Sequence, residues 1–183
     1  MIIAAKSLFP SADLRVIDAR DLRLDDRFDC VMFSFNGIDS VAYSDRETII
    51  RQIATVLRPG GYLIYSTHNV HFPRASMWLN RLFVKELVQA WPRIHVVARS
   101  FVNRLRMYWQ QSCDEEVPFA VVNDVAAEFG YLNVYVDIPQ EVETTLRRGG
   151  FNVVATIGNT RQTPGFGSED NWVYIVAQLI AEA

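Results

Sequence analysis

The stretch from residue 18 to residue 69 constrains the fold of this chain most strongly, because polar residues follow its apolar runs. A short apolar run at 14–17 ends in an aspartate, and a nearly continuous apolar run occupies 28–35. A helical pattern then ends at a Pro-Gly-Gly turn at 59–61, which leads directly into another apolar run. This alternation of strands and helices predicts an α/β fold. Ligands of open α/β sheets lie beyond the carboxyl ends of the strands, so these polar residues are candidates for a binding site.

Length and composition indicate one globular domain over residues 1–183. Hydrophobic residues make up 50% of the chain and charged residues 21%, as is typical of globular proteins with a sizeable core. The net charge of -3 argues against nucleic acid as a partner of the whole chain. No apolar run reaches membrane-spanning length, and the start of the chain lacks the basic region of a signal peptide. The lack of a membrane-spanning run predicts no membrane partner. Cys30 lies in an expected core strand, so we expect no disulfide framework and a cytoplasmic location.

Local patterns predict the elements of this domain. The run at 28–35 suits a strand buried on both faces of a parallel sheet. Ser44 and Glu47 have capping-box spacing at the start of a helix that ends before Pro59. We expect a Rossmann-like, mostly parallel sheet with helices on both faces and a C-terminal antiparallel strand. The other expected elements are a helix at 2–8, strands at 14–17, 62–66, 151–157 and 172–178, a hairpin outside the main sheet at 118–123 and 132–137, and a helix from Pro139 to Gly149.

Residues 74–135 look like an insertion with its own surface. Between 74 and 109 the only acidic residue is Glu86, and the segment is rich in aromatic residues, with helices expected at 75–91 and 101–109. Three interpretations stay open: a lid whose arginines bind an anionic substrate, a partner or nucleic-acid surface, and a solvated helical face over an ordinary aromatic core. The basic residues are Arg74, Arg81, Lys85, Arg93, Arg99, Arg104 and Arg106.

Four segments of the chain follow one another in a characteristic order. They read IDARDL, FDCVMFSFNGID, VLRPGGYLIYSTHN and LRRGGFNVVATIGN followed by NWVYIVAQ. Each is common alone, but their order and spacing resemble the class I S-adenosylmethionine-dependent methyltransferases. The resemblance covers nearly the whole chain apart from the insertion, and it implies S-adenosylmethionine as the cofactor.

The resemblance also implies which residues hold the cofactor. The carboxylate of Asp18 and the backbone N–H of Ala19 match the pair that binds adenine. Phe35, Asn36 and Gly37 match the loop beside the sulfonium. From the residues alone, Asp18 is equally an aspartate that caps its own turn, and 35–37 is a glycine turn after a strand.

His68 follows the strand at 62–66 and is the candidate catalytic residue. Histidine side chains change protonation near neutral pH, so a histidine at this position suits a general base. The alternative is a histidine that only hydrogen-bonds to its neighbours. Asn69 and Tyr135 are candidate substrate contacts, and a packed tyrosine is the alternative for Tyr135. No cluster of histidine and cysteine has metal-ligand spacing, so we expect no metal.

The sequence also departs from the family pattern. It has neither the glycine-rich loop after the first strand nor the acidic residue that binds the ribose, and its first expected strand, at 14–17, resembles the third of the family. Two strands would then be missing between 14–17 and 28–35, which leaves a gap of ~14 Å at ~4.8 Å per strand. The chain is therefore expected to be an N-terminally truncated domain. Movement of the strand at 14–17, or another chain in the gap, is the alternative.

These observations predict a methyltransferase that acts on a small molecule, with weak or no cofactor binding by these residues. The alternative is a non-catalytic module that pairs with a partner chain, or with itself, through an open sheet edge. A different nucleotide-binding Rossmann-like domain is disfavoured, because the chain has no G-x-G-x-x-G motif.

Overall fold

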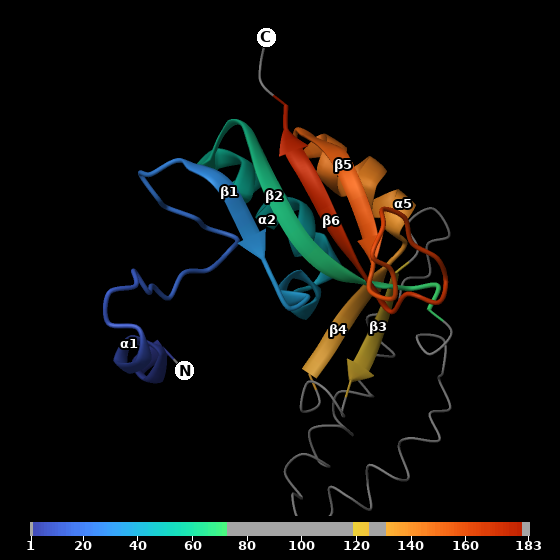
Figure 1. Ribbon diagram of the computed structural model, residues 1–183, viewed down its shortest axis with the longest axis horizontal. Coiled ribbons are helices and arrows are strands. Elements are labelled where there is room, and N and C mark those ends of the chain that lie inside the picture. Colours follow the sequence, from blue (N-terminus) through green and yellow to red (C-terminus); the bar gives the residue numbers. More distant parts are fainter. Residues whose placement is uncertain (1, 73–118, 125–130, 181–183) are drawn as a thin grey trace, which may run out of the picture.

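The computed structural model describes residues 2–72, 119–124 and 131–180. Within these ranges a sheet is packed against helices, and all elements are labelled as in Figure 1. The elements are α1 (Ile2–Leu8), β1 (Phe28–Phe33), the 3-10 helix η1 (Gly37–Ser40), α2 (Tyr43–Val56), β2 (Leu57–Asn69), β3 (Phe119–Asp124), β4 (Tyr131–Val136), α5 (Ile138–Glu141), the π-helical turn η2 (Val142–Leu146), β5 (Phe151–Gly158) and β6 (Trp172–Leu179).

The long strand β2 organises the sheet, whose order is β3-β4-β2-β6-β5 with β1 also paired to β2. β6 runs antiparallel along one edge of β2, at residues 62–68. The other edge is shared: β1 pairs with residues 57–65, and β4 pairs with residues 68 and 69, both in parallel. β4 therefore continues the sheet beyond the carboxyl end of β1, and Figure 1 shows the β3–β4 hairpin projecting from there.

The α/β class is confirmed, but the expected mostly parallel sheet is wrong. Of the five pairings among the described strands, those of β2 with β6, β3 with β4 and β5 with β6 are antiparallel. Antiparallel neighbours need no crossover helix, and β3 is followed in the chain by β4 and β5 by β6. The final strand is antiparallel, as predicted. The hairpin forms close to its predicted positions, but it joins the main sheet because β2 extends past the end of β1.

Helices cover only one face of the sheet in the part of the chain that the structure describes, whereas the sequence predicted both. α2 and the α5–η2 segment lie behind the sheet in Figure 1. Side chains of β2, β5 and β6 on that face are fully or almost fully buried, including Leu63, Tyr65, Phe151 and Ile175. On the opposite face Met32 is 68% exposed, and the rings of Tyr62 and Tyr174 are partly exposed.

The expected strand at 14–17 is wrong, because residues 13–18 form neither helix nor strand. Val16 and Ile17 are exposed, and no described strand lies beside them. β1 forms where it was predicted, but its expected burial on both faces is also wrong. Among the described strands β1 pairs only with β2, so its outer edge and one of its faces lack the neighbours that would bury them.

The helix boundaries differ in detail from their sequence signals. α2 begins after Ala42, with no side-chain hydrogen bond at the cap, so the predicted capping box does not form. The residues at 58–61 form an irregularity at the start of β2, in which Gly60 has a φ of 78°. Asp137 caps α5 through the backbone N–H of Gln140. The predicted helices at 75–91 and 101–109, and most of the insertion at 74–135, lie outside the described residues.

A buried arginine fastens α2 to the rest of the fold. Arg46 lies on the same face of α2 as the core residue Ile49, and its side chain is only 1% exposed. Its Nε and Nη2 donate to Oε1 of Glu141 at 3.0 and 2.8 Å. Its Nη1 donates to Oδ1 of Asp39 at 2.8 Å, and Nη2 also donates to Oγ1 of Thr67 at 2.9 Å. One side chain thus joins α2 to η1, β2 and α5.

We expect the Arg46→Met variant to lose about 3–5 kcal/mol in free energy of unfolding, because two buried carboxylates lose their cation. Arg51→Met is the matched control on the same helix. Arg51 is 62% exposed and pairs with Glu47 at i,i+4, so its loss should cost about 0–1 kcal/mol. Urea denaturation followed by circular dichroism measures both. Similar midpoints for the two variants would contradict the importance of the buried pair.

Candidate functional site

The carboxylate of Asp39 lies at the carboxyl end of β2 and is fully buried. Its Oδ1 accepts from Arg46 Nη1 and, at 2.5 Å, from the hydroxyl of Thr67. Its Oδ2 accepts from the backbone N–H of His68 at 2.8 Å and lies 2.7 Å from Nδ1 of the same residue. Asp39 therefore joins the buried arginine network to the side chain of His68.

Burial and neighbouring charges act in opposite directions in this network. Burial by itself lowers the pKa of Arg46, but the carboxylates of Glu141 and Asp39 outweigh it and raise that pKa above its ordinary value. Burial also raises the pKa of the Tyr65 phenol well above its usual range, and the nearby Glu141 adds to the effect. Arg46 is therefore a fixed cation, and Tyr65 stays neutral at physiological pH.

The His68 ring is held from several sides. On the side away from Asp39, its Nε2 lies 3.3 Å from Nδ2 of Asn36. His68 pairs with Tyr135 on β4 and with Trp172 on β6 in the strand register. The Tyr135 ring stacks on the imidazole, with centroids 4.4 Å apart, and the Trp172 ring meets it edge-on at 6.4 Å. The imidazole is thus fixed in a row of three rings across the sheet.

The turn at 35–37 follows the end of β1, where the sequence predicted a turn. Phe35 and Asn36 have left-handed φ values of 56° and 51°, which are unusual for residues other than glycine. The backbone N–H of Asn36 donates to Oγ of Ser66 on β2 at 3.0 Å. A Cβ at Gly37 would lie 2.9 Å from the Phe33 ring, so this position favours glycine. Phe35 itself is 93% exposed.

In the described part of the chain, Oδ1 of Asn36 is a buried atom without a hydrogen-bond partner. Buried polar atoms are almost always paired in folded proteins, so an unpaired one calls for an explanation. The side chain presents its amide N–H to His68 and leaves its acceptor free. Asn36 therefore has an acceptor to offer a positively charged or hydrogen-bonding group at this site.

Asp18 and Ala19 lie in a turn rather than at a strand end. The carboxylate of Asp18 accepts from the backbone N–H, Nε and Nη2 of Arg20. These bonds from Arg20 lower the pKa of Asp18 to about 2. Arg20 also donates to Asp45 at the start of α2, and Ala19 packs against the core. The segment is held along α2, with its carboxylate engaged by Arg20.

Asn69, a predicted substrate contact, is bound within the protein. Its Nδ2 donates to the carbonyls of Gly167 and Asp170, and its Oδ1 accepts from the N–H of His71. Its own N–H donates to the carbonyl of Asn171. Asn69 thus fastens the end of β2 to the loop between β5 and β6.

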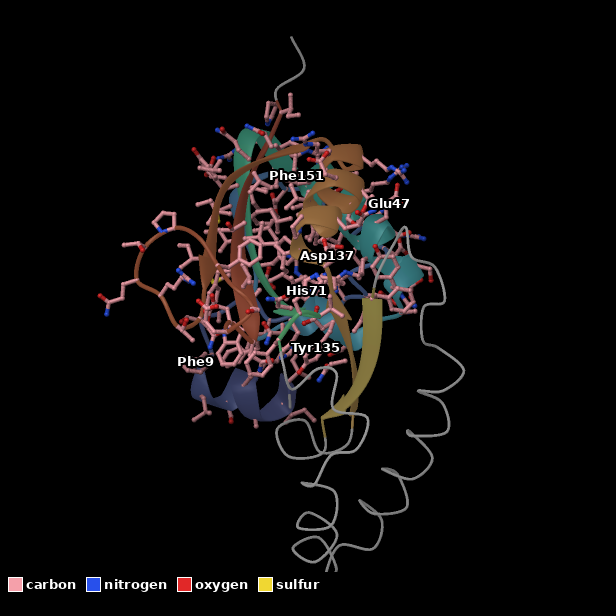
Figure 2. The ribbon with its side chains drawn as sticks, turned by 90° about the vertical axis from the view of Figure 1, so that its right-hand side faces the viewer. Phe9, Glu47, His71, Tyr135, Asp137 and Phe151 are labelled. Atoms are coloured by element: carbon pink, nitrogen blue, oxygen red, sulfur yellow. The ribbon has the colours of Figure 1, made fainter. Side chains whose placement is uncertain are left out.

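A second histidine contact closes the same end of the sheet. Nε2 of His71 lies 2.5 Å from Oδ2 of Asp137, the residue that caps α5. Figure 2 shows His71, Asp137 and Tyr135 in this region, below the helical segment that carries Glu141.

The structure brings together Asn36, His68 and Tyr135 from the predicted residues, with Asn69 next in the chain. Sequence reasoning missed Asp39, Arg46, Glu141 and Trp172. One signal was present: Arg46 stands at helical spacing from the apolar Ile49, Ile50 and Ile53, which places it on the buried face of α2. Among the residues that the structure describes, no group of three potential ligands could hold a metal ion, and no helix is long and apolar enough to cross a membrane.

Comparison with known proteins shows what this chain is similar to. Residues 1–65 match the model of a family described as a methyltransferase domain. The fold is similar to that of an S-adenosylmethionine-dependent methyltransferase from Clostridium acetobutylicum ATCC 824, with a TM-score of 0.57 and 11% identity over 97% of this chain and 70% of that one. Residues 1–65 are therefore similar to a methyltransferase domain, and the fold of the chain is similar to that of S-adenosylmethionine-dependent methyltransferases.

Two other structures support the methyltransferase fold. A methyltransferase from Methanosarcina mazei matches with a TM-score of 0.53 and 18% identity over 99% of this chain and 78% of that one. The glycopeptide N-methyltransferase MtfA matches with a TM-score of 0.53 and 19% identity over 97% and 68%. None of the curated proteins matches the sequence. The predicted resemblance to the methyltransferases is therefore confirmed, while the low identities leave the methyl acceptor open.

The loop between β5 and β6, which accepts hydrogen bonds from Asn69, leads to a prediction on the pH dependence of stability. Burial alone would raise the pKa of Asp170, but bonds from Thr160, Gly167 and Arg161 outweigh it and lower the pKa to about 2. A carboxyl whose pKa is lower in the folded state stabilises the fold above its unfolded pKa, near 3.8, and this contribution is lost as the pH falls toward 2. We expect the free energy of unfolding to fall over that interval, and to fall less steeply in Asp170→Asn. Urea titrations at several pH values measure both slopes, and equal slopes would contradict the prediction.

Proposed function

We propose that this domain takes part in methyl transfer from S-adenosylmethionine to a small molecule, with His68 as the group that accepts a proton. The observation that carries the proposal is the pairing of His68 with the buried carboxylate of Asp39 at the carboxyl end of β2, beside Asn36. A carboxylate–imidazole pair next to a ligand site is an arrangement that suits general-base chemistry. When bound, S-adenosylmethionine supplies a methyl group on a positively charged sulfur.

The residues at the end of β1 fit the sulfonium end of this cofactor. Oδ1 of Asn36 is an unpaired acceptor that would stabilise positive charge nearby. The strained backbone at Phe35 and Asn36 is the kind of feature that clusters at ligand sites. The adenine end is assigned to Asp18 and Ala19, where the ion pair with Arg20 has to open or share the carboxylate.

The acceptor is proposed to lie against His68 and its neighbours. Tyr135 forms one wall of this site, and Asn69 holds the loop that borders it. Positioning of the reactants and exclusion of water would be the main contributions of the protein. The proposal of an anionic acceptor rests on the basic segment at 74–109, which lies outside the described residues. A cytoplasmic location is part of the same proposal.

Nuclear magnetic resonance with S-adenosylhomocysteine tests the cofactor site without an acceptor. We expect amide shifts to change at Asn36 and Gly37, and at Asp18 and Ala19, with binding weaker than micromolar. Asn36→Gly tolerates the same left-handed backbone and removes the amide side chain, so it should reduce these changes.

The amide of Tyr174, on the open face of β6, is the internal control for this titration. Shift changes that avoid residues 35–37 would contradict the proposed cofactor site. A wild-type affinity in the micromolar range would show that the missing glycine-rich loop and ribose acid are not required.

A non-catalytic role in which the chain pairs with a second copy is favoured by one specific observation. β1 has a free edge among the described strands, and Phe28 and Met32 on it are exposed. An unpaired strand edge with exposed apolar residues is a template for pairing with another chain.

Light scattering after size exclusion distinguishes this role. We expect a concentration-dependent dimer for the wild type if β1 pairs, and a shift toward monomer for Met32→Lys, because a lysine at an edge opposes pairing. Val154→Lys is the control, since Val154 is similarly exposed but lies on β5. A monomer at every concentration would argue against this alternative.

A further inference from the structure

The contacts of His68 specify where its proton lies. A carboxylate only accepts hydrogen bonds, so the 2.7 Å contact between Asp39 Oδ2 and His68 Nδ1 requires a proton on Nδ1. In the neutral ring Nε2 is then an acceptor, and Nδ2 of Asn36 faces it as a donor at 3.3 Å. Both ring nitrogens are matched only in this tautomer.

We infer that Asp39 is a positioning residue, which holds the proton of neutral His68 on Nδ1 and so presents Nε2 as the atom that takes the proton of the methyl acceptor. The position of the proton on Nδ1 is independent of the proposed function, whereas the role of Nε2 toward the methyl acceptor rests on it. It assigns a role to a residue that does not itself touch the acceptor.

Hydrogen bonds to both oxygens restrict the orientation of the Asp39 carboxylate. Its Oδ1 is bound by Arg46 and Thr67, and its Oδ2 also accepts from the backbone N–H of His68. All three partners are buried, and Arg46 is in turn held by Glu141. The carboxylate plane is therefore fixed by groups on α2 and β2, and the imidazole is fixed through it.

The buried network carries a net negative formal charge, which one further cation would neutralise. With both carboxylates ionised, Arg46, Asp39 and Glu141 carry one positive and two negative charges, a sum of minus one. In the transfer, a lone pair of the acceptor's nucleophilic atom would form the bond to the methyl carbon, and the carbon–sulfur bond would leave its pair on sulfur. The proton would go to Nε2, and the pair of its broken bond would stay on the nucleophilic atom. The positive charge that sulfur loses then lies on His68, beside the network that balances it.

Asn36 can serve both protonation states of the ring. Its N–H donates to Nε2 of the neutral imidazole, and its unpaired Oδ1 becomes the partner of a protonated Nε2 after the amide turns over. The substrate class follows from this: the methyl acceptor is a hydroxyl or amine compound whose nucleophilic atom still carries a proton when it binds.

The tautomer is measured directly by two-bond nitrogen–proton spectra of the histidine rings at a pH where they are neutral. We expect the proton of His68 on Nδ1 and that of His71 on Nε2, because Asp137 faces Nε2 of His71. The chain has three histidines, so His71→Gln and His95→Gln assign the signals. A wild-type His68 with its proton on Nε2 would overturn the inference, whatever the cofactor does.

Asp39→Asn tests the role of the carboxylate. Its oxygen stays with Arg46 and Thr67, so its NH₂ group faces Nδ1 and should move the proton of His68 to Nε2. Glu141→Gln is the matched control, since it removes the same buried charge without touching His68, and it should keep the proton on Nδ1. A proton that stays on Nδ1 in folded Asp39→Asn would overturn the inference.

The wild-type spectrum tests the predicted tautomer of His68 even if Asp39→Asn does not fold. If S-adenosylhomocysteine fails to bind while the tautomer is as expected, the proposed function fails and the placement of the proton stands.

Discussion

The ion pairs of Arg46 with Asp39 and Glu141 are the interaction on which the rest of the described structure depends. Removing a guanidinium from water is costly, and only close contacts with both carboxylates and with Thr67 offset this cost. Each partner comes from a different element, so the charges are satisfied only when α2, η1, β2 and α5 have assembled. The network therefore favours one arrangement of these elements over other equally apolar packings.

The same network sets the geometry of the candidate site. Asp39 contributes one carboxylate oxygen to Arg46 and the other to His68, so a movement of α2 relative to η1 would change the orientation of the imidazole. The flanking rings of Tyr135 and Trp172 are placed by strand register, which the backbone hydrogen bonds of β2 determine. Stability and site geometry are thus linked through a single side chain.

Local sequence patterns correctly predicted those helices and strands that depend mainly on neighbouring residues. The apolar run of β1, the helix that precedes Pro59 and the hairpin at 119–136 each depend on neighbouring residues, and each forms. The sequence did not predict that Asp39 and Glu141 are buried, because their charges are balanced by Arg46 only in the folded chain. Glu141 is 95 positions from Arg46 in the sequence. The strand expected at 14–17 also failed for a non-local reason, since a strand needs a partner beside it. His68 and Tyr135 could be proposed as candidates because each follows or lies within a strand that could be recognised alone, and Asn36 could be proposed through the family resemblance.

The two halves of the candidate site differ in what holds them. Every contact that orients His68 comes from described residues on the helix-covered side and the centre of the sheet: Asp39, Asn36, Tyr135 and Trp172. The residues assigned to the cofactor lie toward β1, where Phe35 is exposed and Asp18 sits on a segment without regular structure. The half of the candidate site around His68 is therefore held on several sides by described residues. Among the described strands β1 pairs only with β2, so the half assigned to the cofactor has fewer contacts. Asn36 belongs to both halves, because its side chain also contacts His68.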